Sequence, residues 1–385
     1  MGIEQVGRLL RESAAEVPAP QLAEAAWARA VKVRRRRQNL LAATVLAPTV
    51  AAVAVVVVTV RGGHGGTPVR PQTSPPQTIS RAPSVPVDRI PATLSARTGV
   101  SLPRNLGNLA GSPVLGSGSI RRADALYEPS GAKPEPVYVL SGGAFYRLDV
   151  TLQFTLDPAK HALSPLRPTS LSADGRLVAF PQPDKVVVVD LATAQVTNVK
   201  VAGFNAQVLW RSSRSLLVGQ SGAVYAVDVE HESATPVPGG LSLADAAAGA
   251  AGNGTVLELA NGAGLPVREW TIGTAAPRVD AKVDQRGLGR YRVAAWTGPA
   301  WRTGDLVVRA GRSDSPHADV VAVLHGRSGR VVRVLAASAT PLGWLDQHTV
   351  VMQARNGVNG VIAWDIDTGL LTSIAAPFDG TLALP

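Results

Sequence analysis

Residues 97–385 are predicted to form an all-β domain. The chain before them is predicted to hold a helical tail, one membrane-spanning helix and a proline-rich linker. Three features support this division. Residues 40–60 carry no charge, the chain after about residue 103 consists of short β-branched runs between Gly, Asp, Asn and Ser turns, and these runs recur every 39 to 50 residues. Propeller blades are four-stranded sheets of about this length, so we expect a β-propeller of about six blades.

Residues 1–38 are predicted to be a short helical tail. Val6, Leu9 and Leu10 lie at helical spacing, and a second helix is expected over residues 21–36. A segment of this length cannot bury a large core of its own. Two interpretations stay open: the tail only supports the membrane anchor, or it docks onto a cytoplasmic protein.

Residues 39–60 are predicted to span a membrane as one helix. The uncharged run has 21 residues, and at about 1.5 Å per residue it reaches about 30 Å, the thickness of a bilayer core. The main alternative is a signal peptide, but this run is longer than the apolar core of one and begins later in the chain. Pro48 is compatible with a membrane helix, since nearby Thr side chains can satisfy the carbonyl that it leaves free.

A basic cluster sets the expected orientation of this helix. Its members, which flank the helix on the N-terminal side, are Lys32, Arg34, Arg35, Arg36 and Arg37. Positive charge is enriched on the cytoplasmic side of membrane helices, so we expect the N-terminus in the cytoplasm and the large domain outside the cell membrane. The formal net charge is +10, but the other basic residues are scattered, and we expect no nucleic-acid partner.

Residues 61–96 are predicted to be an extended linker. The segment is dense in Gly, Pro, Ser and Thr and has few large apolar residues. Such a composition cannot bury enough surface to fold, so it should act as a spacer that holds the next domain away from the bilayer.

The repeats of the large domain are pairs of β-branched runs. The first run of each pair starts at residue 138, 177, 216, 256, 306 or 350. Trp210, Trp301 and Trp344 precede three of these starts by five or six residues. A large aromatic side chain at the same place in each repeat suits packing between neighbouring blades. A β-sandwich with coincidental spacing is the alternative fold.

Several short motifs resemble those of TolB-type, WD40-like propeller repeats. The stretch from Ser172 to Phe180 is similar to the opening SPDGR-x-(I/V)-AF of such a repeat, and the stretches around Asp190 and Asp365 are similar to its close. Asp-Gly and Thr-Gly pairs are turn chemistry, so this resemblance implies hairpins rather than a ligand. The residues expected to serve the repeats structurally are Asp174, Gly175, Asp190, Trp210, Asp228, Trp301, Trp344, Trp364 and Asp365.

The whole layout resembles actinobacterial single-pass membrane proteins with a propeller ectodomain. Some of these are thought to work beside extracytoplasmic-function sigma factors, so the resemblance implies an anti-sigma-like transmembrane regulator as one function. The usual zinc motif of anti-sigma factors contains cysteine, and this chain has none. That departure weakens the regulatory interpretation.

The sequence shows no constellation of residues that carries chemistry. Its six histidines include no close pair, and there is no G-x-S-x-G elbow, P-loop or dinucleotide fingerprint. No catalytic, cofactor-binding or metal-ligating residue is predicted. We expect a non-enzymatic binding or scaffold module for a protein or cell-envelope ligand. The transmembrane regulator is the alternative, and a propeller-based hydrolase or lyase is the lesser one. The loops at 182–184, 261–263 and 313–317 are candidate binding loops.

Overall fold

The computed structural model describes residues 85–97, 102, 106, 109, 111–156, 161–249, 254–313, 319–355 and 360–385. These residues belong to one compact unit, Thr78–Pro385. The predicted tail, membrane helix, basic cluster and most of the predicted linker lie outside the described residues. Within the described ranges, no helix has the length and apolar character needed to cross a membrane.

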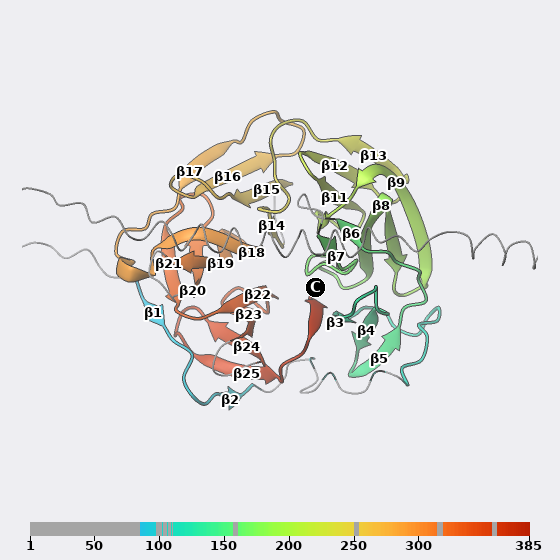
Figure 1. The fold of residues 1–385 in the computed structure, drawn as a ribbon, viewed down its shortest axis with the longest axis horizontal. Helices are drawn as coiled ribbons and strands as arrows, with labels where there is room; N and C mark the ends of the chain where they lie inside the picture. Colours follow the sequence, from blue (N-terminus) through green and yellow to red (C-terminus); the bar gives the residue numbers. More distant parts are fainter. Residues whose placement is uncertain are drawn as a thin grey trace, which may run out of the picture. The chain divides into compact units, whose positions relative to one another are not determined.

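The described residues are almost entirely strands and turns. One short 3-10 helix, η1 (Gly289–Tyr291), interrupts the strands. The strands form seven sheets, four of which have four or more members, and the sheets follow one another around a common centre (Figure 1). The arrangement is that of a propeller with at least these four blades, and it is not a sandwich of two sheets.

The simplest blade is a four-stranded antiparallel sheet in chain order. Its strands are β10 (Gln207–Trp210), β11 (Ser215–Gln220), β12 (Ala223–Asp228) and β13 (Ser233–Pro236). Two-residue turns and short polar turns connect them, so each strand pairs with the next. Figure 1 shows how this pattern repeats in the sheets that follow.

Two larger blades carry extra strands at their edges. The first contains β18 (Val293–Thr303), β19 (Leu306–Ser313), β20 (Asp319–His325) and β21 (Val331–Leu335), with β1 (Val87–Asp88) beside β21 and β14 (Ala247–Ala248) beside β18. The second contains β22 (Ala339–Trp344), β23 (Thr349–Ala354), β24 (Gly360–Asp365) and β25 (Leu371–Ala375), with β2 (Ser95–Ala96) beside β25. The extra strands β1, β14 and β2 all pair in parallel.

The fourth blade joins the two ends of the unit. Its strands are β26 (Gly380–Ala383), β3 (Ala125–Pro129), β4 (Tyr138–Ser141) and β5 (Ala144–Arg147). The last strand of the chain, β26, pairs with β3, and Leu382 lies opposite Tyr127. The sheets are therefore linked into a ring by main-chain hydrogen bonds between segments about 250 residues apart in sequence.

Three smaller sheets complete the described part. They are β15 (Thr255–Leu259) with β16 (Pro266–Thr271) and β17 (Val279–Lys282), then β6 (Thr155–Leu156) with β7 (Ala162–Leu163), and β8 (Leu177–Asp190) with β9 (Gln195–Phe204). Ala246 adds a bridge to β15, and Leu171 adds one to β8.

Strand β8 folds back on itself and supplies two antiparallel strands. If it were straight, its 14 residues would span about 46 Å. Yet the N–H of Leu191, just past its end, donates to the carbonyl of Arg176, just before its start, at 2.9 Å. The strand must therefore fold back on itself, and Asp184 near its middle has the positive φ of 59° that such a turn requires.

The core lies between neighbouring sheets. One buried cluster combines Leu209, Trp270, Trp301, Met352 and Trp364, which come from four different sheets. Packing of this kind requires large side chains on both faces of each blade. The sequence meets that need with strands that are buried along most of their length, such as β15 and β24.

All six hairpins predicted from the repeat spacing are present. The strands that begin them, β4, β8, β11, β15, β19 and β23, start within one residue of the predicted positions. The period of the β-branched runs was therefore sufficient to place two neighbouring strands of each repeat; in the sheet β26-β3-β4-β5 these are the third and fourth strands, and in the other full blades they are the second and third.

The end of the predicted linker differs from its expected form. Residues 85–97 lie on the domain, where β1 and β2 pair with β21 and β25. Asp88 anchors this segment, because its carboxylate accepts hydrogen bonds from Arg333 Nε at 2.6 Å and Trp364 Nε1 at 2.9 Å. Two-residue strands bind through main-chain hydrogen bonds and leave no hydrophobic periodicity in the sequence, so composition alone assigned them to the spacer.

Candidate functional site

Two cavities open at opposite ends of the inner strands. Strand β10 shows this directly, because Gln207 at its start lines one cavity and Trp210 at its end lines the other. We call the second one the tryptophan mouth; it has a volume of about 500 Å³. Its lining consists of Thr169, Leu171, Ser172, Ala173, Asp174, Leu209, Trp210, Arg211, Ser212, Ser213, Ala248, Gly249, Trp301, Arg302, Thr303, Trp344, Leu384 and Pro385.

The tryptophan mouth is built from six separate segments of the chain. They are the residues at and just after the ends of the innermost strands, spaced roughly 40 residues apart on average. Because the inner strands run in the same sense around the ring, their ends meet at one mouth. Figure 1 shows β14, β22 and the end of the chain close to the centre of the ring.

The three tryptophans of the mouth tie neighbouring inner strands together. Trp210 Nε1 donates to the carbonyl of Ser170 at 2.7 Å, and Trp344 Nε1 donates to the carbonyl of Trp301 at 3.1 Å. Trp301 Nε1 donates to the carbonyl of Pro341 at 3.0 Å. Each indole thus uses its only N–H group to donate to a main-chain carbonyl of the adjacent inner segment. Its ring lies against the cavity or the core.

Two arginines directly follow two of these tryptophans and also line the mouth. Arg211 is exposed, and its Nη2 lies 3.4 Å from the carbonyl of Gly254. Arg302 is buried; its Nε donates to the carbonyl of Gly304 at 2.8 Å, and its Nη2 lies 3.7 Å from Glu269 Oε1. Although the Arg211 residue is exposed as a whole, partial desolvation of its guanidinium lowers its pKa from the usual value, and the group stays charged at any physiological pH.

The one acidic side chain in the lining, that of Asp174, forms hydrogen bonds within its own turn. Asp174 Oδ1 accepts hydrogen bonds from Ser172 Oγ at 2.6 Å and from the N–H of Arg176 at 3.1 Å. Gly175 completes this turn with a φ of 71°, and a Cβ on it would lie 2.4 Å from the carbonyl of Ala123. The turn at Gly175 thus holds Asp174 at the rim of the mouth.

The other predicted repeat aspartates lie away from the mouth, at the turns into the outer strands. Asp190, Asp228 and Asp365 each accept hydrogen bonds from the N–H groups two and three residues further along the chain. The N–H of Thr368 is the main cause of the lowered pKa of Asp365, and the N–H of His231 has the same effect on Asp228. Local turn geometry thus accounts for these carboxylates.

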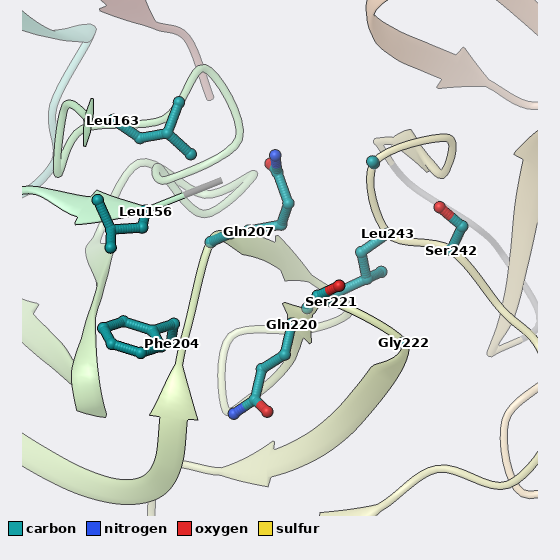
Figure 2. A pocket seen from close by; sticks show the side chains of 12 residues that line it. Leu156, Leu163, Phe204, Gln207, Gln220, Ser221, Gly222, Ser242 and Leu243 are labelled. Atoms are coloured by element: carbon teal, nitrogen blue, oxygen red, sulfur yellow. The ribbon is translucent and has the colours of Figure 1, made fainter. Parts of the chain in front are cut away.

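The second cavity has a volume of about 520 Å³ and an uncharged lining. Figure 2 shows Leu156, Leu163 and Phe204 on one side of it and Leu243 on the other. Phe204 is 59% exposed. Gln207 and Gln220 supply the longest polar side chains of this cavity.

The candidate loops predicted from the sequence do not form the tryptophan mouth. Loops 182–184 and 261–263 join the second and third strands of their repeats, whereas the mouth is made by turns between the first and second strands. Most of loop 313–317 lies outside the described residues. Arg211 and Arg302 were missed, although a signal for them exists: the Trp-Arg pair occurs twice, in phase with the repeats.

Carboxylates and histidines are dispersed elsewhere in the unit. Among the described residues, no group of three or more His, Asp or Glu side chains is placed to hold a metal ion. Glu258 is buried against Trp270 Nε1, which donates to it at 2.6 Å, and burial raises the pKa of its carboxyl group.

Comparison with known proteins leaves the family open. No protein-family model and no curated protein matches the chain significantly. Among solved structures, the chain is similar to BamB from Moraxella catarrhalis, with 17% identity, coverage of 66% of this chain and 71% of that one, and a TM-score of 0.36. It is also similar to a chain of the mitotic checkpoint complex (13%, 84% and 88%, TM-score 0.38) and to U3-55K (12%, 66% and 79%, TM-score 0.41). These scores are low, so the propeller arrangement stands on the sheet topology described above.

Proposed function

We propose that the protein is a non-enzymatic binding scaffold, anchored in the cell membrane, whose extracytoplasmic propeller binds a partner protein at the tryptophan mouth. One observation carries this proposal: six separate segments bring three tryptophans and two arginines to one cavity of about 500 Å³. Trp and Arg are the residue types most enriched among the energetically dominant residues of protein interfaces.

The proposal includes a ring of six blades. Beyond the four larger sheets, β15–β17 with the bridge from Ala246 would be the fifth, and the folded β8 with β9 and the bridge from Leu171 would be the sixth. Each of the six would then contribute one inner segment to the mouth, which agrees with the six segments in its lining.

A blocking substitution at the mouth should abolish partner binding. Ser213 lines the mouth, is exposed and makes no hydrogen bond in the described structure, so Ser213→Arg adds bulk without removing a structural contact. We expect the full chain with Ser213→Arg to recover at least tenfold less of its main co-purifying protein from cell-envelope extract, measured by quantitative mass spectrometry.

The matched control is Ser233→Arg, which makes the same change at an exposed position in β13, outside the mouth lining. It should recover as much partner as the wild type. Equal loss in both variants, or no loss in Ser213→Arg, would mean that the partner binds elsewhere.

Membrane anchoring rests on the uncharged run at residues 40–60 and the basic cluster before it. Deleting residues 40–60 should move the protein from the carbonate-resistant membrane fraction to the soluble fraction, because no other stretch of similar length and apolar character occurs in the sequence.

Protease added to intact spheroplasts should degrade the propeller of the wild type. Survival of the propeller in that assay would reverse the proposed orientation.

A further inference from the structure

Four exposed arginines lie close to the point where the described part of the domain begins. Arg89 directly follows β1, and Arg286, Arg290 and Arg292 belong to the segment around η1. Tyr291 joins the two segments, because its hydroxyl accepts hydrogen bonds from Arg89 Nη2 at 3.0 Å and from Arg290 Nη2 at 2.8 Å. We call these four arginines the arginine patch.

The fold fixes the two segments of the patch beside each other. Val85 and Val87 pack against the same buried cluster as Tyr291, and Leu288 of the η1 segment belongs to that cluster. The parallel pairing of β1 with β21 holds the first segment in place. Side chains 202 residues apart in sequence are thereby brought into hydrogen-bond contact.

The positive charge of the patch is only partly offset. Within the described residues, Asp284 lies 2.8 Å from Arg286 Nη2, and the other three arginines of the patch make no ion pair. Asp88 is already held by Arg333 Nε at 2.6 Å. Four arginines and Asp284 sum to three positive charges (4 − 1 = +3). Residues 312–319, which carry one arginine and two aspartates, would lower this sum only to +2.

The guanidinium groups of the patch can reach an anion outside the protein. Each guanidinium has five N–H donors, and Arg89 and Arg290 each use one of them on Tyr291. These two hydrogen bonds lower the pKa of the Tyr291 hydroxyl, as expected at a site of positive potential. Planar guanidinium groups bind phosphate oxygens in pairs, so a surface that displays phosphate groups suits the patch.

The place of the patch along the chain indicates which phosphate surface it meets. The 24 residues between the apolar run and Val85 include three arginines and no acidic residue. A chain of 24 residues spans about 27 Å when flexible and about 74 Å as an extended polyproline helix. The chain itself therefore keeps this edge of the propeller near the bilayer that holds residues 40–60. Anionic headgroups attract basic side chains over about a Debye length, roughly 8–10 Å.

Contact through the patch would leave the tryptophan mouth accessible. Strand β1 is the outermost member of its sheet, at the opposite edge from β14. Figure 1 shows β1 at the outer rim of the ring, across the ring from β13. No residue of the patch lines the tryptophan mouth.

We propose that the arginine patch docks the outer rim of the propeller onto the phosphate groups of anionic lipids. This inference rests on the membrane anchoring in the proposed function and specifies which edge of the propeller faces the bilayer. The mouth then opens along the membrane surface rather than into the bilayer, where a partner protein can reach it.

The test uses the full chain in lipid nanodiscs and exploits the absence of cysteine from its sequence. A donor fluorophore is attached through Ala294→Cys, two residues past Arg292, or through Ser233→Cys in β13; both positions are exposed. Headgroup-labelled lipid carries the acceptor. The discs contain phosphatidylcholine alone or phosphatidylcholine with an equal part of phosphatidylglycerol.

Three variants separate the charge of the patch from the charge of the whole domain. The main variant combines Arg89→Gln, Arg290→Gln and Arg292→Gln, and a second variant has lysine at the same three positions. The matched control removes three exposed arginines that lie outside the patch and make no ion pair within the described residues: Arg121→Gln, Arg122→Gln and Arg355→Gln. Circular dichroism checks that each variant is folded.

In discs with phosphatidylglycerol, we expect about twofold more energy transfer from position 294 than from position 233, because the patch holds its own edge at the headgroups. The matched control and the lysine variant should keep this difference. The glutamine variant should lose it, as should the wild type in phosphatidylcholine alone or at high salt, since the attraction is electrostatic.

Equal transfer from the two positions in the wild type would overturn the inference, as would an unchanged difference in the glutamine variant. Loss of the difference on adding inorganic phosphate at constant ionic strength would also overturn it, because the patch would then be a site for single phosphate ions.

The two proposals can fail separately. A chain that does not enter the discs would contradict the membrane anchor and the docking that depends on it. A chain that enters the discs but shows no difference between positions 294 and 233 would contradict the docking alone. Neither result changes the capture experiment with Ser213→Arg, which tests the mouth.

Discussion

Truncation of the chain after Asp379 should abolish the cooperative unfolding transition. The truncation removes β26, which supplies the inner strand beside β3 and places Leu382 and Ala383 in the core, where they are 3% and 0% exposed. It also leaves the ring open and the inner edge of β3 unpaired. The loss should be comparable to the whole stability of an ordinary domain, about 5–15 kcal/mol. Urea unfolding followed by circular dichroism measures it.

A milder change in the same strand serves as the graded control. Leu382→Ala keeps the main-chain pairing of β26 and should cost about 2–5 kcal/mol, as other large-to-small core substitutions do. A truncated chain that unfolds with the wild-type midpoint would show that β26 does not close the ring.

Arg309→Met should produce the second-largest loss of stability, about 3–5 kcal/mol, as expected when one partner of a buried ion pair is removed. Arg309 is 3% exposed and links two sheets: its Nη1 lies 3.1 Å from Asp245 Oδ1 and also donates to the carbonyl of Leu259. Its Nε donates to the carbonyl of Gly298 at 3.0 Å. Methionine fills much of the volume but satisfies none of these acceptors.

The control for Arg309 lies in the same strand. Arg312 is exposed in β19, so Arg312→Met should change the free energy of unfolding by less than about 0.5 kcal/mol. The double variant Arg309→Met with Asp245→Asn should recover part of the loss, because it leaves no charged carboxylate without its cationic partner at position 245. Equal stability of Arg309→Met and the wild type would show that the bond network does not hold the two sheets together.

The sequence was informative where a structural need repeats along the chain. The hairpin period placed strands from β4 to β24, because each repeat contains two neighbouring strands that are separated from the rest of the chain by polar turns. Asp190, Asp228 and Asp365 signal their turns for a local reason, since each side chain bonds to main-chain groups two and three residues ahead. Such local chemistry can be read without knowing the rest of the fold.

The sequence was uninformative where the structure depends on contacts between distant segments. Pairing of β26 with β3, and of β1 with β21, joins residues about 250 apart through main-chain groups, which carry no side-chain pattern. The fold-back of β8 is of the other kind, since it was predicted as a hairpin and its turn at Pro183 and Asp184 is local.

Only part of the candidate site could be predicted from the sequence, again because the site depends on contacts between distant segments. Phase with the repeats identified Trp210, Trp301 and Trp344, but not that the ends of the inner strands would converge. The position of the Arg302 guanidinium depends on Gly304 and Glu269, which contact its Nε and Nη2 atoms. No spacing rule in a single sequence encodes that arrangement.

Photocrosslinking in living cells tests binding at the tryptophan mouth most directly. The full chain would carry the photoreactive residue p-benzoylphenylalanine at Ser213, in the mouth, or at Leu370, which is 60% exposed and outside the mouth lining. We predict one dominant protein adduct from position 213 and none of that adduct from position 370. An adduct that forms from position 370 and not from position 213 would contradict binding at the mouth.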